Sequence, residues 1–268
     1  MSRPASLRPR IVSAIVYGIL LIGCLMLHAW AWRGLLLFFA VVLLYELSGL
    51  FWRDVPDRPG RMIAIGAWGA ITLGMMIEWL PEGMITWSAC FWILTLATLF
   101  QYRLKAWMPV LFHALTPLYI ILPILLAESI RGQSGPVSVL LLFLLLWADD
   151  VGAYFIGSWW GKTPFAAQIS PKKTWEGTIG GAILAALVGS LAGWMGMPLT
   201  PWQGVILGLV VALFGTVGDL FESMIKRHYG IKDSGTIMPG HGGLLDRLDS
   251  FLVAMTPYYI MVVFFSNQ

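Results

Sequence analysis

Charged residues are scarce in this chain. Only 12% of its 268 residues are Asp, Glu, Lys or Arg, whereas 58% are hydrophobic. A soluble globule of this length needs more polar side chains to cover its surface, so the composition excludes an ordinary soluble enzyme and indicates a membrane protein. The formal net charge is only +3, and we expect no nucleic-acid partner.

Cysteine is almost absent as well. Cys24 and Cys90 both lie inside apolar runs and form no CxxC pair. We therefore expect neither a disulfide nor a zinc site. The chain also lacks internal repeats and low-complexity linkers. This predicts a single polytopic membrane domain over 1–268.

Long apolar runs are abundant. Hydropathy predicts nine helices near the ~20-residue length that a bilayer requires, so the predicted fold is an all-α integral membrane bundle. The approximate ranges are 11–30, 34–51, 62–79, 85–101, 107–127, 136–150, 177–196, 202–220 and 250–266. The first run is longer than the apolar part of a cleaved signal peptide, so we interpret it as a retained span.

Basic residues are distributed unevenly between the predicted connections. If the amino terminus lies in the cytoplasm, all 17 except Arg33 and Arg131 fall on the cytoplasmic side. Cytoplasmic loops of membrane proteins are enriched in Lys and Arg, so this pattern predicts an N-in, C-out topology. The two longest connections, 151–176 and 221–249, then lie inside. We expect a multi-pass protein of the cytoplasmic membrane with its active site facing the cytoplasm.

Two predicted helices have a small residue at every fourth position. These residues are Gly177, Gly181, Ala185, Gly189 and Gly193 in the seventh helix, and Gly204, Gly208, Ala212 and Thr216 in the eighth. Such faces allow close approach of helix backbones. Either the two helices pack against each other within one chain, or the faces form a homodimer contact.

Acidic residues within spans are costly in a bilayer, so each should have a partner or a function. Asp149 and Asp150 are predicted to close the sixth helix, and Asp219 to end the eighth. Glu46 lies inside the second helix. For Glu46, a helix-packing hydrogen bond and a catalytic role are equally compatible with the sequence.

The last two predicted helices are flanked by residues suited to phosphate chemistry. If the eighth helix continues into the cytoplasm, Asp219, either Glu222 or Ser223, and Lys226 share one of its faces. Asp246 and Asp249 are three residues apart at the start of the ninth helix. Oxygen ligands without a His or Cys cluster suit Mg²⁺ rather than zinc.

Between these helices, Pro239-Gly240-His241-Gly242-Gly243 predicts a tight loop. The backbone N–H groups of such a glycine-rich loop can approach phosphate oxygens. The surrounding basic residues are Lys226, Arg227, Lys232 and Arg247. A surface patch that attracts anionic lipid headgroups would account for the same charges.

The complete string resembles the signature of phosphatidate cytidylyltransferases, also called CDP-diacylglycerol synthases. It is Ser223-x-x-Lys226-Arg227-x₄-Lys232-Asp233-x₅-Pro239-x-His241-Gly242-Gly243-x-x-Asp246-Arg247-x-Asp249. Met238 stands where that family usually has another apolar residue. The resemblance includes Asp149-Asp150-x-Gly152-Ala153-Tyr154 and Ser170-Pro171-Lys172-Lys173-Thr174-Trp175-Glu176-Gly177, so the motifs concentrate in 146–250. The first four helices resemble the family only in hydropathy and spacing.

The resemblance implies that CTP and phosphatidic acid are condensed to CDP-diacylglycerol and pyrophosphate, without a covalent enzyme intermediate. It implies Mg²⁺ held by Asp219, Asp246 and Asp249, with room for a second cation. Lys226 and Arg227 join Asp219 and Asp246 as expected catalytic residues. The expected substrate-binding residues are Lys172, Lys173, Ser223, Lys232, His241, Gly242, Gly243, Arg247, Asp149 and Asp150. The two adjacent aspartates would order the lysine loop or reach the ribose.

Other classes of protein fit less well. CDP-alcohol phosphotransferases need an Asp-Gly-x-x-Ala-Arg string, which does not occur in this sequence. A transporter would explain intramembrane charges and glycine-rich helices, but it leaves the cytoplasmic Lys, Asp and His-Gly-Gly residues unexplained. A relative that acts on an isoprenoid or ether lipid phosphate stays open, because apolar lipid contacts have no readable code.

Overall fold

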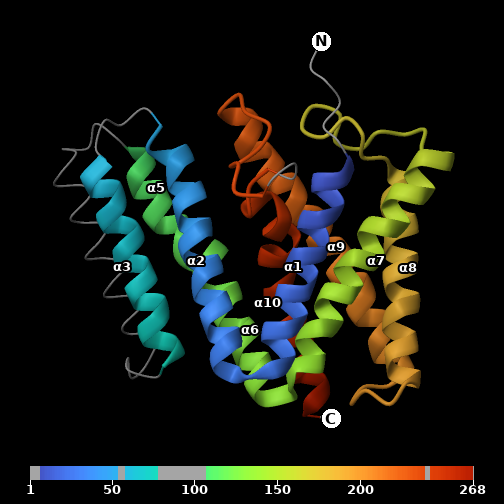
Figure 1. The fold of residues 1–268 in the computed structure, drawn as a ribbon. Helices are drawn as coiled ribbons and strands as arrows, with labels where there is room; N and C mark the ends of the chain where they lie inside the picture. The colour runs from blue at the N-terminus through green and yellow to red at the C-terminus, as the bar shows by residue number, and fades with distance from the viewer. Residues whose placement is uncertain (1–6, 54–57, 78–106, 239–241, 268) are drawn as a thin grey trace. The chain divides into compact units, whose positions relative to one another are not determined.

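The computed structural model describes residues 7–53, 58–77, 107–238 and 242–267 (Figure 1). In chain order its elements are α1 (Leu7–Leu27), α2 (Ala29–Phe51), α3 (Arg58–Met76), α5 (Trp107–Thr116), the π-helical turn η1 (Pro117–Ile121), α6 (Leu122–Ser134), α7 (Pro136–Trp160), α8 (Trp175–Trp194), α9 (Pro201–His228) and α10 (Leu245–Ser266). No strand occurs within the described ranges, where pairing of the β type is limited to isolated bridges.

Six stretches of helix in the described part of the chain are long and apolar enough to cross a membrane. This confirms the prediction of an all-α, multi-pass protein. The predicted fourth helix, 85–101, lies outside the described residues. The total of nine helices and the N-in, C-out topology stay predictions.

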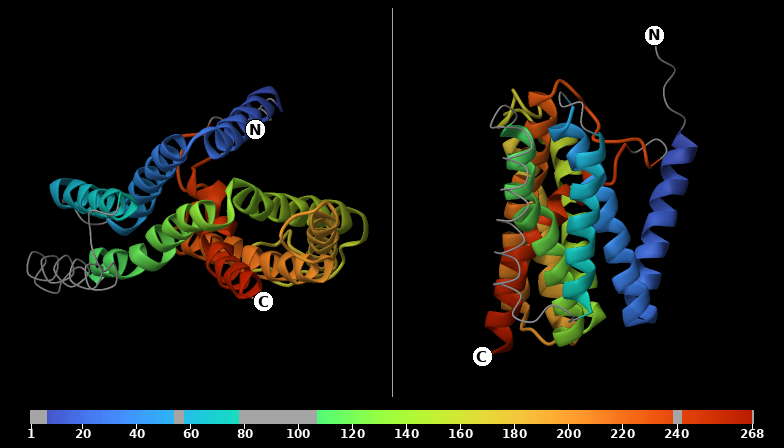
Figure 2. Two further views of the ribbon diagram at one scale, coloured as in Figure 1. Left: turned by 90° about the horizontal axis from the view of Figure 1, so that it is seen from below. Right: turned by 90° about the vertical axis from the view of Figure 1, so that its left-hand side faces the viewer.

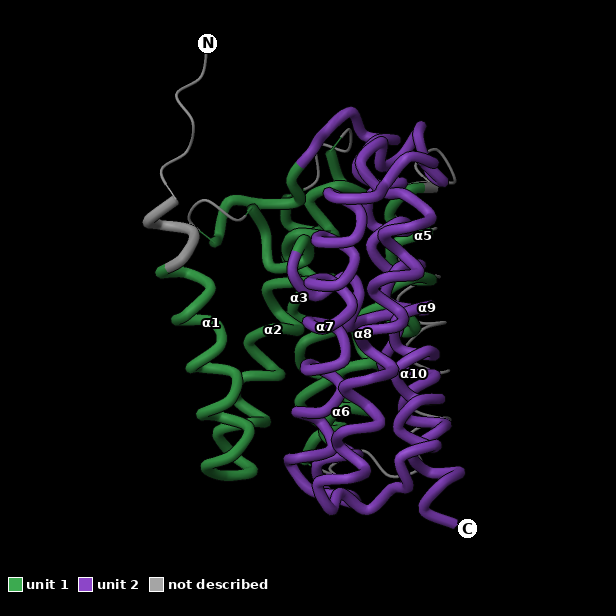
Figure 3. Tube along the Cα trace, turned by 90° about the vertical axis from the view of Figure 1, so that its right-hand side faces the viewer, with its two compact units in different colours: residues 1–128, 233–246 green, residues 129–232, 247–268 purple. Residues whose placement is uncertain are grey.

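The chain forms two compact units (Figure 3). Unit 1 comprises 1–128 and 233–246, and unit 2 comprises 129–232 and 247–268. Unit 1 therefore contains α1, α2, α3 and α5 together with the loop that leads into α10. Unit 2 contains α7, α8, α9 and most of α10. The prediction of one domain over the whole chain stays a prediction.

Polar side-chain contacts link the apolar helices of unit 1. The Arg61 guanidinium of α3 donates to Ser48 Oγ and to the Tyr45 carbonyl of α2, at 2.9 and 2.7 Å. The indole N–H of Trp68 donates to Nδ1 of His113 in α5 at 3.0 Å, and both residues are buried. The buried indole N–H of Trp68 thereby finds an acceptor away from water, as a packed interior favours.

The predicted helix 107–127 is broken by a local irregularity. Its middle turn is the π-helical segment η1, which begins at Pro117, and α6 then continues to Ser134. Proline has no N–H to donate to the preceding turn, so the ladder of helical hydrogen bonds is rearranged there. The helical stretch is also longer than its hydropathy predicts.

In unit 2, the boundary predicted for the sixth helix is wrong. The prediction ended it at Asp150, whereas α7 continues for another ten residues to Trp160. Asp149 and Asp150 therefore lie in the middle of a helix, and the connection to α8 is correspondingly short. Small residues that follow them allow α7 to pack closely on α8, since a Cβ at Gly152 would lie 2.8 Å from the Gly180 carbonyl oxygen.

The small-residue faces of α8 and α9 pack inside the chain. A Cβ placed on Gly189 would overlap the Gly204 carbonyl oxygen, and one on Gly208 would overlap the Ala185 carbonyl oxygen. The end-on view in Figure 2 shows α8 and α9 side by side next to α7. Of the two roles considered for these faces, packing of consecutive helices is therefore the one observed, and no homodimer contact is needed to explain them.

The length of α8 matches a membrane. This helix has 20 residues, which at 1.5 Å per residue span about 30 Å, the thickness of the hydrocarbon core. It begins at Trp175 and ends at Trp194, and both indole side chains are exposed. Tryptophan concentrates at membrane interfaces, so these two residues mark the expected limits of the bilayer on unit 2.

Candidate functional site

The connection between α7 and α8 places two lysines at the start of α8. Thr174 caps this helix, since its hydroxyl accepts from the Gly177 N–H at 3.2 Å. The Glu176 carboxylate accepts from the N–H of Lys162 and from the N–H and hydroxyl of Thr163. These bonds fold the connection back on the helix, which fixes the backbone that carries Lys172 and Lys173.

Lys173 joins this connection to α9. Its ammonium lies 2.6 Å from Oδ2 of Asp219. The other oxygen of Asp219 accepts from the hydroxyl of Ser223, one turn further along α9, at 3.2 Å. Asp219, Ser223 and Lys226 do share one face of a continuous helix, as their spacing predicted, because α9 runs without a break to His228.

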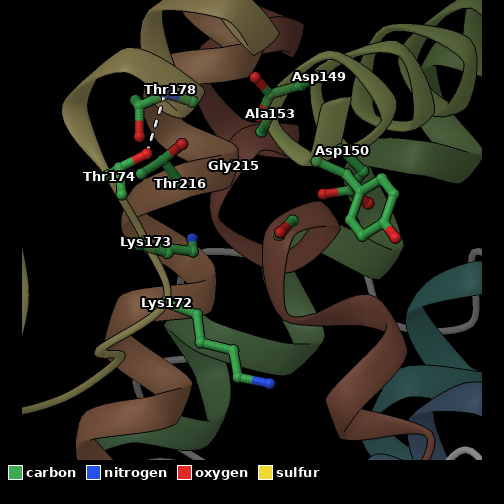
Figure 4. Close-up of a pocket in the computed structure, with 12 residues that line it drawn as sticks. Asp149, Asp150, Ala153, Lys172, Lys173, Thr174, Thr178, Gly215 and Thr216 are labelled. Atoms are coloured by element: carbon green, nitrogen blue, oxygen red, sulfur yellow. Dashed lines mark hydrogen bonds between the residues drawn. The ribbon is translucent and has the colours of Figure 1, made fainter. Parts of the chain in front are cut away.

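A cavity opens beside this ion pair within unit 2. It has a volume of about 180 Å³. Lys172 and Lys173 line it from one side, and Asp149 and Asp150 of α7 line it from the other (Figure 4). Thr174, Thr178, Thr216 and Ser250 add hydroxyl groups to the wall. The cavity thus combines cations, carboxylates and neutral hydrogen-bonding groups in a small volume.

Four carboxylates of unit 2 repel one another around this region. Asp149 is repelled by Asp150, Asp150 by Asp219, and Asp249 by both Asp150 and Asp219. Asp249 is buried, and Asp149 is buried with its Oδ1 atom lacking a hydrogen-bond partner among the described residues. Buried negative charge of this kind is stabilised by a nearby cation. Lys173 supplies part of that positive charge.

The two basic residues at the end of α9 are in different surroundings. Lys226 is buried and forms an ion pair with Glu222, four residues earlier. Arg227 is exposed, and its Nη1 donates to the Ile231 carbonyl at 2.8 Å, beyond the end of the helix. A guanidinium has five N–H donors, so this bond leaves Arg227 able to contact a phosphate.

Asp246 belongs to unit 1, where it organises the loop before α10. Its Oδ2 atom accepts from the N–H and the hydroxyl of Ser234, at 2.9 and 3.0 Å, and from the Gly243 N–H at 2.7 Å. Glu46 of α2 accepts from the N–H groups of Leu244 and Leu245. Two carboxylates thus receive the backbone donors at the start of one helix.

These bonds change the interpretation of the glycine pair. Gly242 has a φ of 86°, a left-handed conformation that favours glycine. The Gly243 N–H donates to Asp246 in this structure, rather than pointing outward for a phosphate. His241 lies outside the described residues. Lys232 and Arg247 are exposed. Lys232 is the last residue of unit 2 before the loop, and Arg247 lies in the first turn of α10.

The structure therefore brings most of the predicted residues into two groups. Unit 2 contains the first group: Asp149, Asp150, Lys172, Lys173, Asp219, Ser223, Lys226 and Asp249. Unit 1 contains Asp246, Gly242 and Gly243. In the described part of the chain, no three His, Cys, Asp or Glu side chains converge as a preformed metal site. The roles assigned to the individual residues stay predictions.

Three residues with clear structural roles were not among the predicted site residues. Glu176 holds the lysine loop, and its place in the first turn of a helix, where a carboxylate is favourable, was the available signal. Ser234 contacts both Glu46 and Asp246. Nothing in the local sequence links Glu46 to Ser234, because 188 residues separate them.

Comparisons with known proteins agree with this picture. The sequence profile described as the cytidylyltransferase family matches residues 8–265. A phosphatidate cytidylyltransferase of Staphylococcus aureus (strain COL) is 32% identical over 235 residues, which are 84% of this chain and 86% of the relative. The proteins of the same name from Bacillus subtilis and Synechocystis are 41% and 44% identical, over 135 and 131 residues. Those matches cover 50% and 48% of this chain, and the chain spans only about half the length of these two relatives.

Proposed function

The chain belongs to the cytidylyltransferase family, and from that premise we propose that it condenses CTP with phosphatidic acid to give CDP-diacylglycerol and pyrophosphate. The relatives bear the name of this activity. The alternative acceptors, isoprenoid or ether lipid phosphates, differ from phosphatidic acid only in the lipid part. Apolar contacts to that part would decide which acceptor is used.

The observation that most supports this proposal is the ion pair between Lys173 and Asp219. Lys173 belongs to the string before α8, and Asp219 lies on α9 one turn before Ser223, where the second string begins. Their contact joins the first string to the helix on which the second begins, and Lys173 also lines the cavity. A protein that only attracted lipid headgroups would not need this pairing.

The proposed reaction is a single displacement at phosphorus. A phosphate oxygen of phosphatidic acid attacks the α-phosphorus of CTP, the bond from that phosphorus to the bridging oxygen breaks, and pyrophosphate leaves. Such a transfer is accelerated mainly by positioning the reactants and by neutralising phosphate charge. Lys172 and Lys173 would bind phosphate groups of the substrates, and Arg227 would add a bidentate contact.

The residues fit a magnesium-dependent reaction. Mg²⁺ in such sites is usually bound by one or two carboxylates, with substrate phosphates completing the shell. The buried, unpartnered oxygen of Asp149 and the mutual repulsion of Asp219 and Asp249 favour a cation in this part of unit 2. We propose Asp219 and Asp249 of unit 2 as its ligands. From the family resemblance we also propose Asp246 as a ligand of Mg²⁺, with a second cation able to share the site. When bound, Mg²⁺ would neutralise charge on the triphosphate and the leaving pyrophosphate.

The cavity suits a part of the nucleotide. Its volume of about 180 Å³ is below the roughly 300–1,000 Å³ of pockets that enclose a drug-sized ligand. A ribose or a phosphate group would occupy it, with Asp149 or Asp150 as acceptors for ribose hydroxyl groups. The rest of CTP would lie outside this cavity.

We also propose that the chain resides in the bacterial cytoplasmic membrane, with N-in, C-out topology and the active site at the cytoplasmic face. The distribution of Lys and Arg supports this orientation. The phosphatidic acid would then come from the bilayer and the CTP from the cytoplasm. A homodimer remains compatible with this arrangement.

One assay tests the proposal. Purified protein is incubated with labelled CTP, Mg²⁺ and phosphatidic acid in mixed micelles, and the CDP-lipid and pyrophosphate are quantified. We expect both products in equal amounts, and none when phosphatidic acid or Mg²⁺ is omitted. Folded protein that forms neither product would contradict the proposal and favour a transporter or lipid-binding role.

A further inference from the structure

Glu46 is a carboxylate near the C-terminal end of the apolar helix α2, and its contacts lie far away in the sequence. Only 4% of the residue is exposed. Its two oxygens accept from the Leu244 N–H at 3.0 Å and the Leu245 N–H at 2.8 Å. The hydroxyl of Ser234 lies 3.3 Å from the same carboxylate. All of these groups belong to unit 1, so the contacts lie within one compact body.

The surrounding backbone is fitted to this side chain. A Cβ at Gly235 would collide with the Glu46 carboxylate, with its carboxyl carbon only 2.9 Å away. A Cβ at Gly243 would lie 2.6 Å from one Glu46 oxygen and 2.7 Å from the other. Neither glycine has a positive φ, so both are required for space rather than for backbone conformation. Gly235 and Gly243 therefore pack against Glu46 from two parts of the loop.

Ser234 connects Glu46 to Asp246. Its hydroxyl lies 3.0 Å from Asp246 Oδ2 and 3.3 Å from Glu46 Oε2. A hydroxyl has a single proton to donate, and the shorter distance assigns it mainly to Asp246. Asp246 receives two further bonds from the N–H groups of Ser234 and Gly243. The orientation of Asp246 therefore depends on a loop that Glu46 holds in place.

We propose that Glu46 is a positioning residue for the reaction: it fixes Ser234 and the backbone at Leu244 and Leu245 and, through them, the carboxylate of Asp246. This inference rests on the proposed function, in which Asp246 is a ligand of Mg²⁺. It assigns a role to a residue of the second helix, in the part of the chain without signature motifs. It also explains why a costly carboxylate is kept inside an apolar span.

A kinetic experiment separates positioning from general packing. In Glu46→Gln one acceptor oxygen becomes an amide that cannot accept, so one loop N–H loses its partner. We expect the turnover number to fall about tenfold and the Mg²⁺ concentration for the half-maximal rate to rise by a similar factor. Ser48→Ala is the matched control. Ser48 is a buried residue of the same helix as Glu46, and its hydroxyl accepts from the Arg61 guanidinium of α3 rather than from the loop. It should leave the Mg²⁺ response unchanged.

A labelling experiment tests the contact without any activity. Ile237 is an exposed loop residue, so Ile237→Cys is placed in a background with Cys24 and Cys90 replaced by serine. We expect Glu46→Ala to raise the rate of maleimide labelling at this cysteine by about tenfold, because the loop loses all of its Glu46 contacts. Ser48→Ala should not change it. If the wild type makes no CDP-lipid, the proposed function fails while this measurement still decides the role of Glu46.

The collision at Gly235 supplies a second test of the same contact. Gly235→Ala should disturb the loop in the wild-type background, and it should add little further effect when Glu46 is already Ala, because the colliding atoms are gone. Additive effects of the two substitutions, unchanged labelling in both Glu46 variants, or equal kinetic losses from Glu46→Gln and Ser48→Ala would each overturn the inference.

Discussion

Asp219 is the residue on which the most contacts of the proposed site converge. It accepts from Lys173 and Ser223, and it repels Asp150 and Asp249. A carboxylate with this many neighbours is held in one orientation before any substrate arrives. That preorganisation is what phosphoryl transfer requires, since the enzyme contributes position and charge rather than covalent chemistry.

We predict that Asp219→Asn and Asp246→Asn each abolish turnover and leave a folded, membrane-inserted protein. The amide keeps the shape but removes the charge that would hold Mg²⁺. The loss should reach about 100-fold or more, since each ~1.4 kcal/mol of lost transition-state stabilisation is a factor of ten in rate. The rate is measured against Mg²⁺ concentration for both variants.

Asp233→Asn is the control for this experiment. Asp233 is exposed in the loop of unit 1, and we expect a milder effect if it only positions Lys232. An Asp246→Asn enzyme with a near-normal rate and metal response would show that Asp246 only closes the loop through Ser234 and Gly243. The ligand assignment would then be wrong for that residue.

Arg227 allows a test of phosphate binding against surface attraction. Arg227→Lys keeps the charge but loses the planar fork and the bond to the Ile231 carbonyl. We expect the KM for CTP to rise about tenfold, with little change in the amount of protein bound to anionic vesicles. Steady-state kinetics and vesicle sedimentation are measured on the same preparations. Wild-type kinetics would favour a headgroup-binding patch.

At the scale of helices, the close contact of α8 and α9 is the most sensitive packing feature of unit 2. We predict that Gly189→Ala lowers the thermal midpoint of unfolding, because its Cβ would overlap the Gly204 carbonyl oxygen and force the helices apart. Overpacking of this kind costs about 1–3 kcal/mol. Thermal unfolding is followed by tryptophan fluorescence in detergent.

Gly23→Ala provides the matched control, because a Cβ at Gly23 in α1 would have no atom within 4 Å. This variant should be neutral or slightly stabilising, since alanine favours helix more than glycine. If Gly189→Ala changed the oligomeric state instead of the midpoint, the α8 face would be a contact between chains. Size-exclusion chromatography of both variants distinguishes the two results.

The helices themselves could be predicted largely from hydropathy. The expected faces of small residues are found in α8 and α9. The predicted helices 202–220 and 250–266 were too short, since α9 continues to His228 and α10 begins at Leu245. The end of the sixth helix was wrong because two adjacent aspartates were interpreted as a boundary. In the structure they face a polar cavity from the middle of α7, and hydropathy averaged along the chain cannot detect such a cavity.

The same limit applies to the site. Spacing along one helix predicted that Asp219 and Ser223 share a face, since 3.6 residues complete a turn. It could not pair Lys173 with Asp219, or Glu46 with Ser234, because no local rule links residues so far apart in the sequence. The family resemblance, now confirmed, indicated that these strings belong to one site, but their contacts became visible only in the structure.

At the scale of the whole molecule, the orientation in the membrane decides which substrates can reach the site. In unit 2, Gly132 lies at the end of α6 before α7, and Lys162 lies just after α7. The 25 residues of α7 extend for about 37 Å, more than the ~30 Å of the hydrocarbon core, so the two positions lie beyond opposite ends of one span. Both are exposed.

We predict that Gly132→Cys and Lys162→Cys, each in a background with Cys24 and Cys90 replaced, label from opposite faces of the membrane. A membrane-impermeant maleimide should modify Gly132→Cys in right-side-out vesicles and Lys162→Cys in inverted ones, because basic residues collect on the cytoplasmic side. Labelling of both sites after detergent addition confirms that each cysteine is reactive. Labelling of both from one face would contradict α7 as a span. The reverse pattern would place Lys172, Lys173 and Asp219 on the side of the membrane opposite the cytoplasm. CTP could not reach them there, which would contradict the proposed reaction.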